Sequence, residues 1–253
     1  FLVRARPLHP TLGQPVRGGF AAGLSVRGGR VGLDVETGAE PGALALRAAG
    51  DTGVLEGLAG TVVVQEFPLP FYGIGDNAVG DATLLEIARV LWNQRASLKR
   101  SVRIAWWPGH STGRYAGSTW FADHFAIELD KYCVAQVNCD SPGCRWATEF
   151  LDLEAMPEAA ELISGIIADA SPASEVNIAR PSRAGDYSFN NIGLTGYLML
   201  SSNMPRHKQA ELGYYDVGGC GSNIAWHTEN DTIEIADRDI LLRDIKVYLL
   251  TVL

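Results

Sequence analysis

Cysteine, histidine and basic residues are scarce in this sequence. Its 253 residues include four cysteines and five histidines, and 21 Lys and Arg residues stand against 29 Asp and Glu residues. The net charge of -8 argues against nucleic acid as a partner, because phosphate binding needs a basic face. The cysteines lack the spacing of a zinc ribbon, so reduced, partly buried thiols are favoured over disulfides.

Long apolar runs are missing as well. No stretch approaches the length that a membrane-spanning helix needs, so we predict no membrane span. The sequence begins at Phe1 without a methionine or a signal-like segment, which indicates an incomplete N-terminus, and a cytoplasmic location is slightly favoured. The hydrophobic content of 47% suits one sizeable globular domain, or one domain with a remnant of another.

Apolar, β-branched runs alternate with segments of helical periodicity through most of the chain. The pattern predicts strands at 61–64, 102–107, 133–139, 175–178 and 196–200, and helices from Gly80 to Arg95 or Leu98, at 119–131, at 157–170 and from Asp237 onward. This alternation predicts an α/β fold of three layers, α/β/α, around a mostly parallel mixed central sheet. Residues 1–40 are typical of β-hairpins, and we interpret them as a remnant of an inserted or preceding β-rich segment, with the main domain at 41–253.

The stretch from Gly73 to Gly80 predicts a sharp loop in front of a helix. Its glycines permit positive φ and close packing of the backbone. The loop delivers one carboxylate, Asp76, to the region of a helix N-terminus, where negative charge is favoured. Asp76 is therefore either a helix cap or turn residue, or a metal ligand at the mouth of a sheet.

Polar residues follow several of the predicted strand ends, namely Glu66, Asp76, His110, Asp140 and, after a longer excursion, His227. The ligand site of such a sheet lies outside the carboxyl ends of its strands, so we expect these side chains on one rim. Carboxylates and imidazoles are ligands suited to zinc. A carboxylate that bridges two metals would suit the rigid position of Asp76.

Three neighbouring features leave alternatives open. Asp231 follows His227 by four residues and is expected to orient its imidazole. Residues 109–113 have the outline of a nucleophile elbow, which makes a serine hydrolase that uses Ser111 or Ser118 a third interpretation. Asp140 precedes Ser-Pro-Gly, and in isolation it reads as an ordinary turn former.

Four segments together resemble the catalytic domain of the zinc aminopeptidases of the M28 type, the aminopeptidase Y and glutamate carboxypeptidase group. The segments are Gly75–Gly80, Val137–Gly143, Gly185–Leu194 and Trp226–Thr232, and the resemblance covers residues 60–253. It implies a zinc-exopeptidase-like fold, a zinc site with one or two ions, and a peptide or small amide substrate. It also implies that Asp76 bridges two metals, that Asp140 and His227 are ligands, and that Asp186, Tyr187 and Phe189 line the substrate pocket. Residues 1–40 are similar to the end of a protease-associated insert.

Two positions depart from the pattern of that family. Its His-x-Asp is replaced by Glu66-Phe67-Pro68, in which Glu66 could still bind metal. Its pair of glutamates, one the general base and one a ligand, is replaced by His110 and Ser111. His110 then serves either as the base or as a ligand, so we expect one good metal site and a doubtful second one.

The sequence therefore predicts a metal-dependent, aminopeptidase-like hydrolase with reduced activity, which cleaves peptide or related amide bonds through metal-activated water. The alternative is a catalytically inactive relative that binds a peptide or small ligand in the same cleft, because fold does not imply function.

Overall fold

The computed structural model describes residues 2–4, 21–27, 30–36, 73–106, 115–182, 187–199 and 202–253, with the backbone alone described in the first three ranges and in 197–199. The chain divides into two compact units. The first comprises Phe1–Glu66, Ala88–Gln136 and Ser188–Leu194, and the second comprises Phe67–Ile87, Val137–Tyr187 and Thr195–Leu253. Within the described ranges, no helix combines the length and the apolar character needed to cross a bilayer.

The first unit holds the strands β1 (Leu2–Arg4), β2 (Ala21–Arg27), β3 (Arg30–Glu36), β4 (Ser101–Trp106) and β5 (Cys133–Val137). They lie in the order β3-β2-β4-β1-β5, and the pairings described among them are antiparallel. In β4, Val102, Ile104 and Trp106 are buried and the residues between them are half-buried. That alternation is the period-two pattern of a strand. β2 and β3 form the hairpin expected in residues 1–40, and β2 also pairs with β4.

Two helices of the first unit, α4 (Ala116–His124) and α5 (Ala126–Tyr132), pack around a small aromatic core. The sequence predicted a single helix at 119–131. Phe125 interrupts it with φ -108° and ψ 14°, and its ring packs against Phe121 with 4.6 Å between centroids. The aromatic contact therefore accompanies a break that helical periodicity does not reveal.

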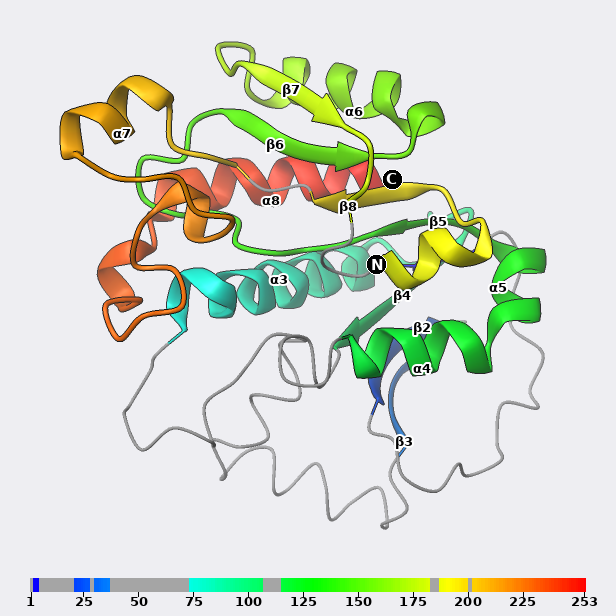
Figure 1. The fold of residues 1–253 in the computed structure, drawn as a ribbon. Helices are drawn as coiled ribbons and strands as arrows, with labels where there is room; N and C mark the ends of the chain where they lie inside the picture. The colour runs from blue at the N-terminus through cyan, green and yellow to red at the C-terminus, as the bar shows by residue number, and fades with distance from the viewer. Residues whose placement is uncertain are drawn as a thin grey trace. The chain divides into compact units, whose positions relative to one another are not determined.

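In the second unit, β6 (Phe150–Ala155) lies between β8 (Gly196–Met199) and β7 (Val176–Ala179). β6 pairs with β7 in parallel and with β8 in antiparallel orientation. A parallel pair needs a crossover connection, and α6 (Pro157–Ala170) supplies it, with the bounds that the sequence predicted. Figure 1 shows β7 alongside β6, with α6 next to them. Ile163 and Ile167, one helical turn apart, are fully buried.

Helix α8 (Arg238–Val252) contacts α6, and Asp237, from which the sequence predicted this helix to run, is its N-cap residue. Asp237 Oδ1 accepts the N–H groups of Asp239 and Ile240, both at 3.0 Å, which satisfies two of the free donors of a helix N-terminus. The remaining described helices are α3 (Val79–Asn93) and α7 (Arg206–Leu212).

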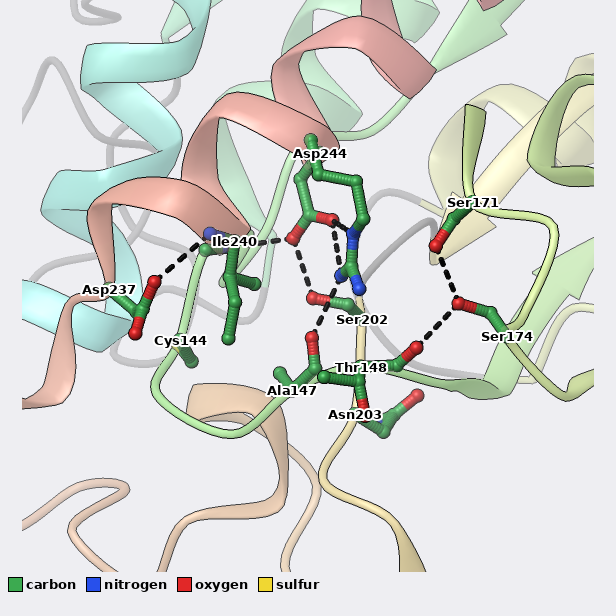
Figure 2. Close-up of polar contacts among 12 residues, drawn as sticks. Cys144, Ala147, Thr148, Ser171, Ser174, Ser202, Asn203, Asp237, Ile240 and Asp244 are labelled. Carbon is green, nitrogen blue, oxygen red and sulfur yellow. Dashed lines mark hydrogen bonds and ion pairs between the residues drawn. The ribbon is translucent and has the colours of Figure 1, made fainter. Parts of the chain in front are cut away.

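A buried carboxylate ties α8 to the segment that follows Asp140. One oxygen of Asp244 accepts Gly143 N at 2.7 Å and Ser202 Oγ at 2.5 Å. The other oxygen accepts Arg243 Nη2 at 2.6 Å, and the same guanidinium nitrogen donates to Ala147 O at 2.8 Å. Figure 2 shows this network converging on Asp244.

The elements confirm the α/β class predicted from the sequence, with strands and helices of mixed order. The strand predicted at 61–64 lies outside the described residues. The boundary predicted at residue 40 also lies outside them and stays a prediction.

Candidate functional site

The carboxylate of Asp76 is the centre of the site. Its Oδ2 accepts the indole N–H of Trp226 at 2.9 Å and lies 3.1 Å from Nε2 of His227. Its Oδ1 is buried, and among the described residues it has no hydrogen-bond partner. The Asp76 side chain is 6% exposed, whereas that of His227 is 53% exposed, so solvent reaches the pair from the histidine side.

The turn around Asp76 is built as the glycines predicted. Gly73 has a left-handed φ of 55°, and its carbonyl accepts Ala78 N at 3.0 Å. A Cβ on Gly75 would lie 2.8 Å from both Cys220 Sγ and Ile235 Cγ2, so only glycine lets the backbone approach so closely. The Asp76–Asn77 peptide bond is cis. Among the residues that the structure describes, the Asp76 side chain contacts Trp226 and His227 and no helix N–H group, so the helix-cap interpretation is wrong.

Asp231 fixes this turn through hydrogen bonds to its main chain. Its carboxylate accepts Gly75 N at 2.6 Å through Oδ1 and Asp76 N at 3.0 Å through Oδ2, and the Cys220 thiol lies 3.5 Å from Oδ2. Asp231 is 3% exposed. Burial raises the pKa of its carboxyl, while the two N–H groups oppose the shift. The sequence predicted that Asp231 orients the His227 imidazole, but its contacts go to the main chain of the Asp76 turn instead.

His227 is held by a ring contact as well as by Asp76. The Trp226 and His227 rings stack with 4.0 Å between centroids. The hydrogen bond to Asp76 raises the pKa of His227, burial opposes the shift, and the charges of Asp76, Asp140 and Asp231 add to it. Neither Trp226 nor its contact was predicted, although an aromatic residue directly before the histidine was visible in the sequence.

Strained backbone gathers in the same part of the second unit. Ser141, Cys220, Ser222 and His227 all have left-handed φ values, between 48° and 66°. Each such residue costs on the order of 1–3 kcal/mol and persists only where surrounding contacts impose it. Residues of this kind concentrate at functional sites, which favours this region as the site.

Asp140 lies at the end of the segment after β5. Its Oδ1 accepts Ser141 Oγ at 3.1 Å. Within the described ranges, no three His, Cys, Asp or Glu side chains are grouped closely enough to hold a metal ion. The structure therefore brings Asp76 and His227 together, and Asp140 does not complete a group of three with them.

The other predicted site residues divide between the two units and the undescribed ranges. Glu66, His110 and Asp186 lie outside the described residues, as does Ser111. Tyr187 begins a short 3-10 helix, Tyr187–Ile192. Phe189 is 2% exposed and packs against Phe121 with 6.3 Å between centroids, so in this structure its ring offers a substrate almost no surface.

Comparison with known protein families identifies the chain. The profile of Peptidase family M28 matches residues 57–251, well over half of the sequence. The chain belongs to Peptidase family M28. A comparison with curated proteins found no match.

Solved structures agree with the M28 assignment at the level of the fold. BSAP, a zinc aminopeptidase from Bacillus subtilis, is 18% identical with a TM-score of 0.56, over 73% of this chain and 43% of that one. The LapA aminopeptidase of Legionella pneumophila is 18% identical with a TM-score of 0.54, over 71% and 46%. A glutaminyl cyclase from an Acidobacteriales bacterium is 16% identical with a TM-score of 0.56, over 73% and 62%. The chain thus spans less than half the length of these two aminopeptidases.

The donor atoms of this M28 chain fit two positions of a zinc site. Ligands about 2.0–2.1 Å from a tetrahedral zinc ion lie about 3.3 Å from each other. The separation of 3.1 Å between Asp76 Oδ2 and His227 Nε2 is close to that value. Asp76 Oδ1, which is buried and has no hydrogen-bond partner in the part of the chain that the structure describes, is a further acceptor that a cation would satisfy.

Proposed function

We propose that this chain is a zinc-dependent, aminopeptidase-like hydrolase of peptide or related amide bonds. Family membership supports the peptidase class, and the Asp76–His227 pair supports a metal site. In the proposal, Asp76 and His227 hold zinc, Asp140 joins them as a third ligand when the ion binds, Glu66 adds a fourth donor, and the second metal position is weak or absent. Asp186 and Tyr187 contribute to the substrate pocket.

One observation carries the proposal, namely that Oδ1 of Asp76 is buried with no hydrogen-bond partner among the described residues. A buried carboxylate oxygen without a donor is costly, because it has lost water and gained nothing in return. The turn that presents it is fixed by Asp231 and Trp226, so the atom cannot simply swing into solvent. A bound divalent cation removes the cost.

Bound zinc would activate a water molecule and polarise the substrate carbonyl. The chain's own residues orient the Asp76 carboxylate and accept the proton. Trp226 donates its N–H to Asp76 Oδ2 and thereby fixes the orientation of the carboxylate. Asp231 holds the main chain of the same residue. His110 accepts a proton on its imidazole near neutral pH, in place of the glutamate that M28 enzymes of the resembled type use.

A second candidate is a relative that binds a peptide or small ligand without catalysis. The changes at Glu66 and at His110 and Ser111 favour it, because they alter both flanks of the metal site. The similarity to glutaminyl cyclases adds an N-terminal glutamine peptide to the substrates that a test should include.

The test combines metal analysis with activity assays. We expect purified protein to retain about one equivalent of zinc and to hydrolyse aminoacyl nitroanilides, with activity lost on chelation and restored by zinc. His227→Ala should lower zinc affinity by about 100-fold, and His110→Ala should abolish hydrolysis while zinc remains bound. His207→Ala, which changes an exposed histidine of α7, is the matched control and should match wild type.

Other outcomes discriminate among the candidates. Less than about a tenth of an equivalent of zinc, with chelator-insensitive hydrolysis, would overturn the proposal. Bound zinc and peptide without turnover would favour the inactive relative. Cyclisation of a glutaminyl peptide without hydrolysis of nitroanilides would point to the cyclase reaction.

A further inference from the structure

The side-chain amide of Asn77, the residue after Asp76, grips the main chain on both sides of Asp140. Asn77 Nδ2 donates to Cys139 O at 2.9 Å. Asn77 Oδ1 accepts Ser141 N, also at 2.9 Å. Asn77 is 3% exposed, so both hydrogen bonds form away from water. The two contacts join positions 62 and 64 residues apart in the sequence.

This pair of hydrogen bonds restrains both the position and the orientation of Asp140. A donor to Cys139 O and an acceptor from Ser141 N together leave the intervening residue, Asp140, little freedom to shift or rotate. The amide is satisfied by main-chain groups that do not depend on any side-chain rotamer. Its geometry therefore relates the Asp76 turn directly to the backbone that presents Asp140.

Gly80 provides the space that the amide occupies. A Cβ at position 80 would lie 2.2 Å from Asn77 Oδ1 and 2.6 Å from Cγ and Nδ2. Gly80 lies in the first turn of α3, although glycine is about 1 kcal/mol less favourable than alanine inside a helix. The glycine thus accommodates Asn77 in place of a better helix former.

The Asp140 segment has further supports, and two thiol contacts, Cys139 Sγ to Gly80 O at 3.7 Å and Cys144 Sγ to Gly75 O at 3.8 Å, join it to the Asp76 turn beside the shorter hydrogen bonds of Asn77. Cys220 N donates to Ser141 Oγ at 3.2 Å, and Asp244 accepts Gly143 N. Ser141 itself has a left-handed φ of 48°, which only such surrounding contacts can maintain.

We propose that Asn77 is a positioning residue that sets the separation and orientation of the Asp76 and Asp140 carboxylates for metal binding. The inference rests on the proposed function, since it concerns the same zinc site. Asn77 acts through the main chain and does not contact the metal or the substrate.

The experiment compares zinc affinity, measured by competition with a chromogenic chelator, across four variants of the full chain. Asn77→Asp keeps one acceptor but loses the donor to Cys139 O, and Gly80→Ala displaces the amide without altering it. We expect each to weaken zinc binding by about 10-fold or more, and Asn77→Ala to weaken it at least as much. Gly165→Ala is the matched control, because a Cβ at that helical glycine meets nothing within 4 Å.

A second readout does not depend on zinc. Hydrogen exchange of the Ser141 amide in metal-free protein should accelerate in Asn77→Ala, with the thermal midpoint recorded to show that the variant is folded. Zinc affinity in Asn77→Asp and Gly80→Ala equal to wild type would overturn the inference and leave the proposed function standing. If wild type binds no zinc, both the proposed function and the metal-positioning role of Asn77 fail. Faster Ser141 exchange in Asn77→Ala would then still establish that Asn77 restrains the main chain at Ser141.

Discussion

Asp231 and Asp76 are two carboxylates held close together, and main-chain N–H groups separate their roles. The two carboxylate oxygens of Asp231 accept the N–H groups of Gly75 and Asp76. The Asp76 carboxylate is directed at His227. Hydrogen bonds to a charged acceptor contribute about 1.5–3 kcal/mol each. Asp231 therefore anchors the main chain of the Asp76 turn. A substitution of the Asp76 side chain would not reveal this role.

Replacing Asp231 by Asn tests that anchor. An amide can accept only one of the two N–H groups and turns its own donor toward the other, so we expect a loss of about 1–2 kcal/mol in unfolding free energy. We also expect zinc affinity to fall about tenfold. Denaturant unfolding and chelator competition measure the two effects. Glu229→Gln, an exposed change two residues earlier, should leave both values unchanged; equal behaviour of the two variants would contradict the anchor role.

Asp152 gives a pH-dependent prediction. Its carboxylate accepts Asn203 Nδ2 at 3.0 Å. Desolvation raises its pKa, the charges of Asp216 and Glu154 add to the shift, and Arg206 opposes it. A carboxyl whose folded pKa exceeds the unfolded value contributes stability at pH below the unfolded pKa and loses it as pH rises through the folded pKa.

Asp152→Asn should therefore raise the thermal midpoint relative to wild type at pH 7, and by less at pH 4. Calorimetry at both pH values measures the difference. Glu161→Gln, an exposed change on α6, should show no such dependence on pH. A larger gain at pH 4 than at pH 7 would reverse the predicted sign.

At the scale of elements, α8 supports the Asp140 segment through Asp244. The carboxylate meets Gly143 N, Ser202 Oγ and the Arg243 guanidinium, and it is 1% exposed. Asp244→Asn leaves Arg243 without its buried anion, so we expect a loss of about 3 kcal/mol in unfolding free energy. Denaturant unfolding measures it. Asp239→Asn, in the exposed first turn of the same helix, is the control, and comparable losses in both variants would refute a special role for Asp244.

The elements that sequence reasoning located best are those with a buried apolar face. The bounds of α6 were predicted because Ile163 and Ile167 repeat with helical spacing behind Pro157. α7 was missed because none of its residues is buried, so it has no periodicity to detect. β6 was missed because Asp152 and Glu154 interrupt its apolar pattern.

The candidate site likewise contains features that the sequence predicted and features that it missed. Asp76 and His227 were predicted to meet, from the positions of strand ends and from family resemblance, and they do. The role of Asp231 was assigned wrongly because sequence spacing does not say whether a carboxylate faces a ring or a backbone amide. The grip of Asn77 on residues 139 and 141 depends on a fold contact across more than sixty positions, which no local pattern encodes.

At the scale of the whole molecule, a bound metal should stabilise the fold through linkage. A ligand at about 100 times its Kd contributes about 2.7 kcal/mol, which corresponds to a rise of about 5–10 °C in the thermal midpoint for a chain of this size. A thermal shift with excess zinc measures it. His227→Ala should remove most of the rise and His207→Ala should not; an equal rise in both would mean that zinc binds elsewhere.

The bonds that hold the Asp76 turn reach 155 and 156 residues along the chain to Asp231. Contacts of such long range form after local ones, because a long loop must close first. A ribosome-bound chain that has not yet released residue 231 therefore carries the turn without its anchor. If the chain is the hydrolase we propose, its competence appears only after residue 231 has been synthesised and released, so a nascent copy that lacks this residue would leave its substrates uncut.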